Sequence, residues 1–292
     1  MLRVVWDLIR VRQWYKNLVI FLSILFVGRF FELDSLVLTL IGFFCLCFIS
    51  SANYVINDIV DLKRDRENPE KKNRPLAFGK ISALWAGLLA LPLILASMFF
   101  AYLIAPKFAL AVLAIFIVGQ AYNFFLKHEA FADVLTIAVN FMLRSISGAY
   151  ILNLNISPWI VLCTFMLSIF LSVSKRAGEF SLLAENATAH RSVLQAYTKE
   201  VTSSLMIVAT VMLTMSYSLY SFLSNKNLII TLPAALYVIF RYFYLSHSNA
   251  QIVRHPELVF KDVRMVIGVA LWAILIFALL YFSQTLSALL QF

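Results

Sequence analysis

Residues 36–65 read LVLTLIGFFCLCFISSANYVINDIVDLKRD, an apolar run that becomes a charged segment after Asn57. Residues 36–57 carry no charged side chain, and a helix of that length spans a hydrocarbon core of roughly 30 Å. The rest of the stretch, residues 58–65, contains Asp58, Asp61 and Asp65. The stretch therefore predicts a transmembrane helix with an acidic end at the membrane surface.

The rest of the chain shares this apolar character. Of its 292 residues, 62% are hydrophobic and 13% are charged, and the mean hydropathy is +0.87. So few charges cannot cover the surface of a soluble domain of this length. Because backbone polar groups in lipid must be bonded internally, the runs predict an all-α polytopic membrane protein with one domain, residues 1–292.

Reading the apolar runs between charged or turn residues predicts about nine transmembrane helices in one bundle around a cytoplasm-facing cavity. The predicted spans are 17–31, 36–57, 83–104, 108–126, 134–152, 158–174, 203–224, 228–246 and 265–289.

Basic residues are distributed unequally between the two sides of these spans. With a cytoplasmic N-terminus, 20 of the 24 Lys and Arg residues fall in or beside cytoplasmic segments. The other side keeps Arg29, Lys107 and Lys226, and Arg144 lies inside a span. This asymmetry predicts an N-terminus inside the cell and a C-terminus outside. It also explains the net charge of +9 without a nucleic-acid partner.

The aspartates after residue 57 carry the clearest chemical signal. If the helix continues, Asp58, Asp61 and Asp65 fall at i, i+3 and i+7, within an arc of about 60°, and Asn57 borders that arc. Carboxylates on one face repel each other, so a cation must offset them. Hard oxygen ligands suit Mg²⁺, which takes its other ligands from water and substrate phosphates. The competing interpretation is a solvated loop in which the aspartates pair with nearby basic residues.

A second polar signal lies in the predicted span 134–152. Asp133, Asn140, Arg144 and Ser147 form a stripe at helical spacing, and Arg144 lies roughly 16 Å along the axis from Asp133. An arginine at that depth costs several kcal/mol unless it faces a partner or a wet cavity. We therefore interpret Arg144 as lining a functional cavity, with a purely structural pairing as the alternative.

The aspartate segment matches the N-D-x-x-D-x-x-x-D signature of the UbiA superfamily of intramembrane prenyltransferases. The rest of the chain resembles the decaprenyl-phosphate phosphoribosyltransferase branch of that superfamily. The resembling residues are, in order, Arg12 to Asn17, Leu126 and Lys127, Asp133 and Val134, Leu143 and Arg144, Pro158 and Trp159, Lys175, Arg176 and Glu179, Arg191 to Leu194 with Tyr197, and Pro256, Glu257 and Asp262. Two residues depart from the branch. Val11 stands where the branch commonly has proline, and Asn140 stands where it often has glycine.

The resemblance implies a Mg²⁺-dependent enzyme that transfers 5-phosphoribosyl from phosphoribosyl diphosphate to a polyprenyl phosphate lipid. It implies that Asp58, Asp61 and Asp65, with Asn57, hold Mg²⁺ and the donor diphosphate. The implied phosphate ligands are Arg74, Lys127, Lys175 and Arg176, with Arg12 and Lys16 for the lipid phosphate. The remaining candidate substrate-binding residues are Tyr122, Asp133, Arg144 and Glu179.

Two other functions remain open at this point. One is a UbiA-type prenyltransferase that moves an isoprenyl diphosphate onto an aromatic acceptor, although Lys175 and Arg176 stand where such enzymes usually carry a second aspartate-rich motif. The other is a transporter or lipid-binding protein with Arg144 on its path. The resembling branch suggests a bacterial inner membrane, and the sequence leaves room for a homo-oligomer.

Overall fold

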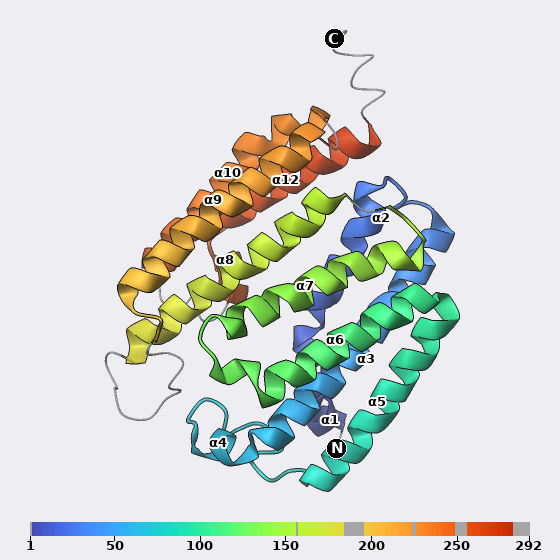
Figure 1. The fold of residues 1–292 in the computed structure, drawn as a ribbon, viewed down its shortest axis with the longest axis vertical. Helices are drawn as coiled ribbons and strands as arrows, with labels where there is room; N and C mark the ends of the chain where they lie inside the picture. The colour runs from blue at the N-terminus through green and yellow to red at the C-terminus, as the bar shows by residue number, and fades with distance from the viewer. Residues whose placement is uncertain (1, 156, 184–195, 224–225, 249–255, 283–292) are drawn as a thin grey trace. The chain divides into compact units, whose positions relative to one another are not determined.

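The computed structural model describes residues 2–155, 157–183, 196–223, 226–248 and 256–282. In this part of the chain every regular element is an α-helix or a 3-10 helix (Figure 1). The predicted all-α class is therefore confirmed. The chain divides into two compact units, Met1–Lys127 with Asn140–Ile156 and His128–Val139 with Ser157–Phe292. A single domain over the whole chain stays a prediction.

The first unit is built around one long central helix, α3, which packs against α5, α6 and η1. Small residues allow the close approach of α5: Ala52 on α3 and Ala86 and Ala90 on α5 are buried together. Ser97 Oγ on α5 also donates to the carbonyl of Cys45, at 2.7 Å. The elements are α1 (Leu2–Leu8), η1 (Val11–Phe21), α2 (Leu22–Phe26), α3 (Leu33–Val60), α4 (Leu62–Glu67), α5 (Ala83–Ile104) and α6 (Pro106–Phe124).

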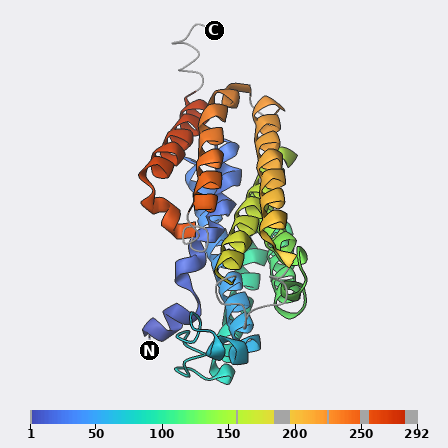
Figure 2. The same cartoon turned by 90° about the vertical axis from the view of Figure 1, so that its left-hand side faces the viewer.

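Two elements link the units, namely η2 (Leu126–His128) and α7 (Ala132–Ile151). In the second unit α8 packs on α9, and α9, α10 and α12 stand side by side (Figure 2). Asp262 caps α12 by accepting a hydrogen bond from the Met265 amide at 2.7 Å, which satisfies one of the free donors at a helix start. The elements are α8 (Pro158–Leu183), α9 (Lys199–Leu223), η4 (Lys226–Thr231), α10 (Leu232–Ser248), η5 (Pro256–Lys261) and α12 (Val263–Tyr281).

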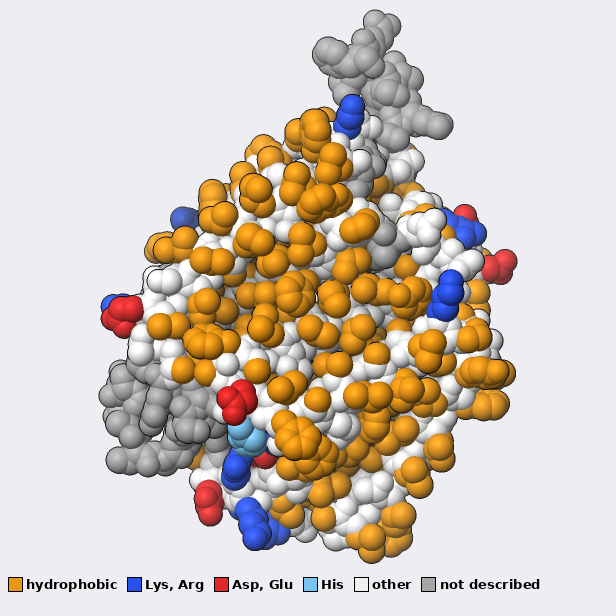
Figure 3. Space-filling view, in the orientation of Figure 1, with side chains coloured by type: hydrophobic (Ala, Val, Ile, Leu, Met, Phe, Trp, Pro, Cys, Tyr) orange, Lys and Arg blue, Asp and Glu red, His pale blue; other side chains and the backbone are white. Residues whose placement is uncertain are grey.

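The outer helices expose apolar side chains. On α5, Leu91, Leu95 and Phe99 are 53–61% exposed, and apolar side chains cover most of the face drawn in Figure 3, with charged ones near its margins. A soluble protein rarely exposes an apolar surface of this extent. Eight helices in the described residues are long and apolar enough to cross a bilayer. The chain is therefore a multi-pass membrane protein.

The predicted first span, 17–31, is the one that does not appear among these eight helices. Its residues form the end of η1, the five-residue helix α2 and a turn at Gly28, which has a φ of +80°. Ile20 and Ile24 are fully buried in the protein, and Ser23 Oγ donates to the Ser145 carbonyl at 3.0 Å. Hydropathy alone does not separate such protein-buried residues from lipid-facing ones, so the predicted count of nine is not confirmed.

Candidate active site

The aspartate segment forms the junction between α3 and α4. Asp61 (φ −90°, ψ 7°) separates the two helices. The Asp61 amide still donates to the Asn57 carbonyl at 2.9 Å, and the Asp65 amide donates to the Asp61 carbonyl at 2.8 Å. This four-residue spacing continues the helical path across the junction. Asp58, Asp61 and Asp65 are all buried, with exposed fractions of 3%, 7% and 2%.

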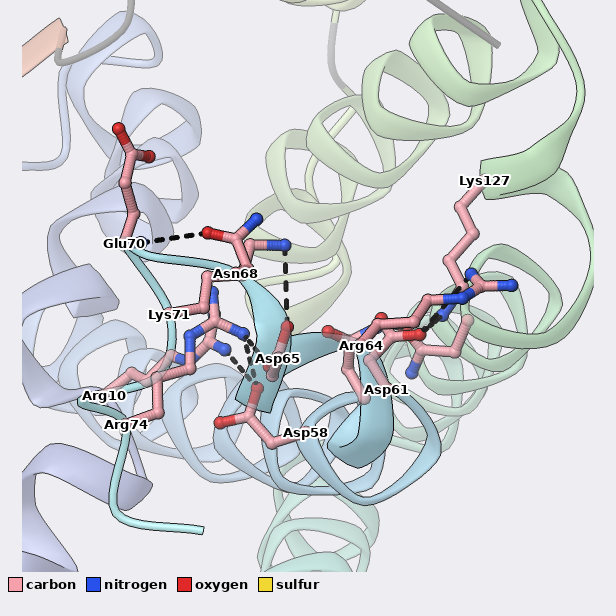
Figure 4. A network of polar contacts seen from close by, with 12 residues as sticks. Arg10, Asp58, Asp61, Arg64, Asp65, Asn68, Glu70, Lys71, Arg74 and Lys127 are labelled. Atoms are coloured by element: carbon pink, nitrogen blue, oxygen red, sulfur yellow. Dashed lines mark hydrogen bonds and ion pairs between the residues drawn. The ribbon is translucent and has the colours of Figure 1, made fainter. Parts of the chain in front are cut away.

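Arg74 holds two of these carboxylates together. Its Nη1 lies 3.0 Å from Asp58 Oδ1 and 2.6 Å from Asp65 Oδ2 (Figure 4). Arg10 also donates to Asp58, and Lys71 Nζ lies 3.7 Å from Asp65 Oδ1. Buried like charges destabilise each other, and these basic side chains supply positive charge next to the two carboxylates.

Asp61 is paired with a different cation. Lys127 Nζ donates to Asp61 Oδ1 at 2.7 Å, and the lysine side chain is 1% exposed. Asn57 Nδ2 donates to Asp61 Oδ2 at 3.3 Å, and Arg64 Nη1 lies 4.0 Å from Asp61 Oδ1. Charges taken out of water are tolerated only when close partners offset the lost hydration, and Asp61 and Lys127 meet that condition.

The whole cluster is positively charged. The basic side chains within 4.0 Å of the three aspartates are Arg10, Arg64, Lys71, Arg74 and Lys127. Five cations against three carboxylates leave an excess of two positive charges. Four of these basic side chains are 21–67% exposed, so solvent can reach them and so can an anion that enters from the water. The cluster is therefore suited to a ligand with several negative charges.

A row of amide side chains positions Asp61 from inside the first unit. Gln120 Nε2 donates to Asn53 Oδ1, and Asn123 Nδ2 donates to the Asn53 carbonyl at 3.2 Å. Asn57 Nδ2 then donates to Asn123 Oδ1 at 2.9 Å as well as to Asp61. The row joins α3 to α6, because Asn53 and Asn57 lie on α3 and the other two amides on α6.

Replacing Gly119 with alanine should destabilise this row. A Cβ at Gly119 would lie 2.7 Å from Asn53 Cγ, so either the Asn53 side chain would have to leave its place in the row or α6 would have to move away from α3. We expect a loss of about 1–3 kcal/mol in the free energy of unfolding, measured as a lower melting temperature in detergent. Gly87→Ala on α5 is the matched control, since nothing lies within 4 Å of its Cβ. Equal melting temperatures for the two variants would contradict this packing.

The carboxylates of the aspartate cluster are compatible with a magnesium ion. In the described residues, however, no group of three His, Cys, Asp or Glu side chains lies close enough together to bind a metal by itself. Asp58 and Asp65 both contact Arg74 Nη1, so these two carboxylates are close enough to share one cation. Mg²⁺ commonly binds through one or two carboxylates and completes its shell with water and substrate phosphates. Asp61 would join such a set only by exchanging its contact with Lys127.

The second unit has a buried polar cluster of its own. Arg176 Nε donates to Asp133 Oδ2 at 2.8 Å, and Arg176 Nη1 donates to Glu179 Oε2 at 2.5 Å. The Tyr197 hydroxyl donates to Asp133 Oδ1 at 2.5 Å and accepts from the Phe131 amide at 2.9 Å. Burial and the hydrogen bond to Asp133 raise the pKa of Tyr197, so the phenol stays protonated at neutral pH and orients the carboxylate.

Three of the other predicted site residues, Arg12, Lys16 and Tyr122, form no hydrogen bond or ion pair with the aspartate cluster in the described structure. Arg12 is exposed and Lys16 is half-buried, and neither forms a hydrogen bond or ion pair with a described residue. Tyr122 is half-buried on α6 beside Asn123. Lys175 is exposed on α8. The structure therefore joins neither Arg12 nor Lys16 to the aspartate cluster.

Four residues that contact these clusters were not among the predicted site residues, namely Arg10, Arg64, Lys71 and Tyr197. Arg10 reaches Asp58 and stacks on the Tyr54 ring, 4.9 Å from its centroid. It adopts a left-handed conformation (φ 52°) between α1 and η1, and the sequence offered no sign of that turn. Tyr197 contacts Asp133 across 64 positions of the chain. Only its place in the resembling motif pointed to it.

Arg191, Ser192, Val193 and Leu194 lie outside the described residues, and so does most of the loop before Pro256. Asp262 is described, and it pairs with Arg241, whose Nη2 lies 2.6 Å from Asp262 Oδ2.

Comparisons with known proteins match most of the chain. A model of the UbiA prenyltransferase family matches residues 18–255. A decaprenyl-phosphate phosphoribosyltransferase of Mycolicibacterium smegmatis is 31% identical over 232 residues, which cover 77% of this chain and 73% of that protein. A protein of the same name from Mycobacterium tuberculosis is 29% identical over 218 residues, covering 73% and 72%.

A solved structure shares the fold. A UbiA homolog from Archaeoglobus fulgidus, bound to GPP and Mg²⁺, superposes with a TM-score of 0.70 over 92% of this chain and 99% of that chain. The two sequences are 19% identical, so this likeness concerns the fold alone.

Proposed function

This chain belongs to the UbiA prenyltransferase family, and we propose that it transfers 5-phosphoribosyl from phosphoribosyl diphosphate to a polyprenyl phosphate. The observation that carries the proposal is the cluster at the α3–α4 junction, where one buried and four more exposed basic side chains lie within 4.0 Å of three buried carboxylates. Such a cluster suits a diphosphate with a divalent ion. The names of the relatives support the choice of donor and acceptor.

The donor diphosphate would lie against Asp58 and Asp65, with Arg74 and Arg10 beside it. A Mg²⁺ ion held by these carboxylates would stabilise the negative charge that develops on the departing diphosphate. Arg74 contacts both carboxylates in the structure, and it can turn part of its planar guanidinium to phosphate oxygens when the ion binds. Asn57 would keep Asp61 oriented through its amide.

The reaction exchanges one C–O bond for another. The bond from ribose C1 to the diphosphate oxygen breaks, and the diphosphate leaves with the electron pair. An oxygen of the polyprenyl phosphate then forms the new bond to C1. Since that oxygen is already anionic, no strong general base is required, and positioning and electrostatic stabilisation provide the rate.

Two neighbouring residues on α8 of the second unit have separate proposed roles. Arg176 is held by Asp133 and Glu179, so we assign it chiefly to orienting this helix segment. Lys175 is exposed next to it and is our candidate for a phosphate contact from α8. A water-soluble donor and the positive-inside rule together favour the cytoplasmic face of a bacterial plasma membrane, with the N-terminus inside.

A direct donor assay tests the proposal. Purified protein in lipid nanodiscs with Mg²⁺ would receive a polyprenyl phosphate and labelled phosphoribosyl diphosphate, or an aromatic acceptor and labelled geranyl diphosphate. We expect a lipid-linked phosphoribosyl product from the first mixture only. A prenylated aromatic product, formed without any lipid-linked phosphoribose, would instead establish the aromatic prenyltransferase. The Asp58→Asn protein serves as the inactive control for both mixtures.

A further inference from the structure

Arg144 is a buried cation without a carboxylate partner. It lies on α7 within the first unit, and 8% of its surface is exposed. No Asp or Glu of the described residues forms an ion pair with it. Its Nε has no hydrogen-bond partner in the described structure. Its Nη2 reaches only Ser50 Oγ, at 3.4 Å, which is longer than an ordinary hydrogen bond.

Other buried basic side chains of the described residues are neutralised. Lys127 is paired with Asp61 at 2.7 Å, and Arg176 with Asp133 at 2.8 Å. An arginine always carries its charge in a protein, and a buried charge without a partner is strongly destabilising. Arg144 therefore lacks the anion that its burial requires, and the side chains around it do not supply one.

The immediate surroundings of Arg144 are uncharged. The Phe141 ring lies over the guanidinium, with its centroid 5.1 Å from Cζ, and polar side chains lie nearby. Ser50 donates to Asn17 Oδ1 at 3.3 Å, and Asn17 Nδ2 donates to Cys47 Sγ at 3.3 Å. Asn140 lies one turn before Arg144 on α7, and its Oδ1 is also buried without a partner. The site thus combines a cation that lacks an anion with an acceptor that lacks a hydroxyl or amide donor.

This site is separate from the aspartate cluster. Ser50 precedes Asp58 by eight residues on the continuous helix α3, which is about 12 Å at a rise of 1.5 Å per residue. A diphosphate held at Asp58 would therefore leave Arg144 to a different anionic group.

We propose that Arg144, Asn140 and Ser50 form a subsite for a phosphate monoester. The guanidinium would bind the phosphate oxygens through two parallel N–H donors, and Asn140 Oδ1 would accept from the P–OH of a singly protonated phosphate. This inference rests on the proposed function, in which both substrates carry a phosphate monoester, namely the 5-phosphate of the donor and the phosphate of the lipid. Both sources share the chemistry that the subsite recognises.

Equilibrium binding to protein in nanodiscs separates the two sources. The probes are phosphoribosyl diphosphate with Mg²⁺ and farnesyl phosphate as a short polyprenyl phosphate. Arg144→Gln should weaken one probe by about 10- to 100-fold, the loss expected for a charge-assisted contact, and leave the other nearly unchanged. Arg144→Lys should recover part of the loss, because it keeps the charge without the planar fork.

The control is Arg241→Gln, which removes an arginine that is paired with Asp262 and should alter neither affinity. Loss of donor binding assigns the subsite to the 5-phosphate, and loss of farnesyl phosphate binding assigns it to the lipid. The subsite is overturned if Arg144→Gln binds both probes with unchanged affinity. It is also overturned if each of the two variants, Arg144→Gln and Arg144→Lys, loses the same affinity for both probes. Wild-type protein that binds neither probe contradicts the proposed function, and the subsite with it.

Discussion

Replacing Asp58 with asparagine should lower turnover by about 10²- to 10³-fold. Asp58 accepts hydrogen bonds from both Arg10 and Arg74 and is 3% exposed. The substitution keeps the size of the side chain but removes the charge that would hold a metal-bound diphosphate. A single electrostatic contact to developing charge is typically worth two to three orders of magnitude in rate. Initial rates of phosphoribosyl transfer at saturating donor measure the effect.

The control for Asp58→Asn is Asp34→Asn, the same substitution in the first turn of the same helix α3. Asp34 is exposed and should lose little activity. The melting temperature of Asp58→Asn should be measured in parallel, so that a loss of folded protein is not taken for a loss of turnover. Full activity of a folded Asp58→Asn protein would contradict the assignment of this carboxylate.

Replacing Lys127 with methionine should destabilise the protein by about 3–5 kcal/mol, because it leaves the buried Asp61 carboxylate without its closest cation. The pair is 2.7 Å apart, with side-chain exposures of 1% and 9%. Adding Asp61→Asn should restore most of the stability, since a buried pair replaced as a whole costs much less than a broken one. Activity should stay low in the double variant, because the cluster proposed to bind the donor would lose two of its charged side chains.

A double-mutant cycle separates these effects. The melting temperatures of wild type, the two single variants and the double variant yield the coupling between Lys127 and Asp61. Additive losses would show that the two side chains do not depend on each other in the folded protein. Recovery of activity together with stability would show instead that the pair is structural only.

Long apolar helices could be predicted closely from the sequence. The span predicted at 83–104 is Ala83–Ile104 in the structure, and the other seven candidate spans differ mainly at their ends. The largest extension is in α8, predicted to end at 174 and found to reach Leu183. Charged residues such as Lys175 end an apolar run, but they do not interrupt backbone hydrogen bonds, so the helix continues beyond the membrane edge.

Only part of the candidate site could be predicted from the sequence. The spacing of Asp58, Asp61 and Asp65 predicted that they gather on one helical path, and their burial agrees with that. Their pairing was not predictable: Asp58 and Asp65 share Arg74, while Asp61 pairs with Lys127. Long-range contacts of this kind depend on how helices pack, which hydropathy and spacing do not encode. The family resemblance, by contrast, is confirmed by the comparisons.

The role assigned to the aspartates is tested most directly by the Mg²⁺ dependence of donor binding. Phosphoribosyl diphosphate would be titrated into nanodisc-embedded protein with Mg²⁺ or with a chelator, for wild type and for Asp58→Asn/Asp65→Asn. We predict that Mg²⁺ strengthens binding to the wild type by tenfold or more and has little effect on the variant. Equal strengthening by Mg²⁺ in both proteins, with the variant folded, would contradict the claim that these carboxylates hold the metal and the diphosphate.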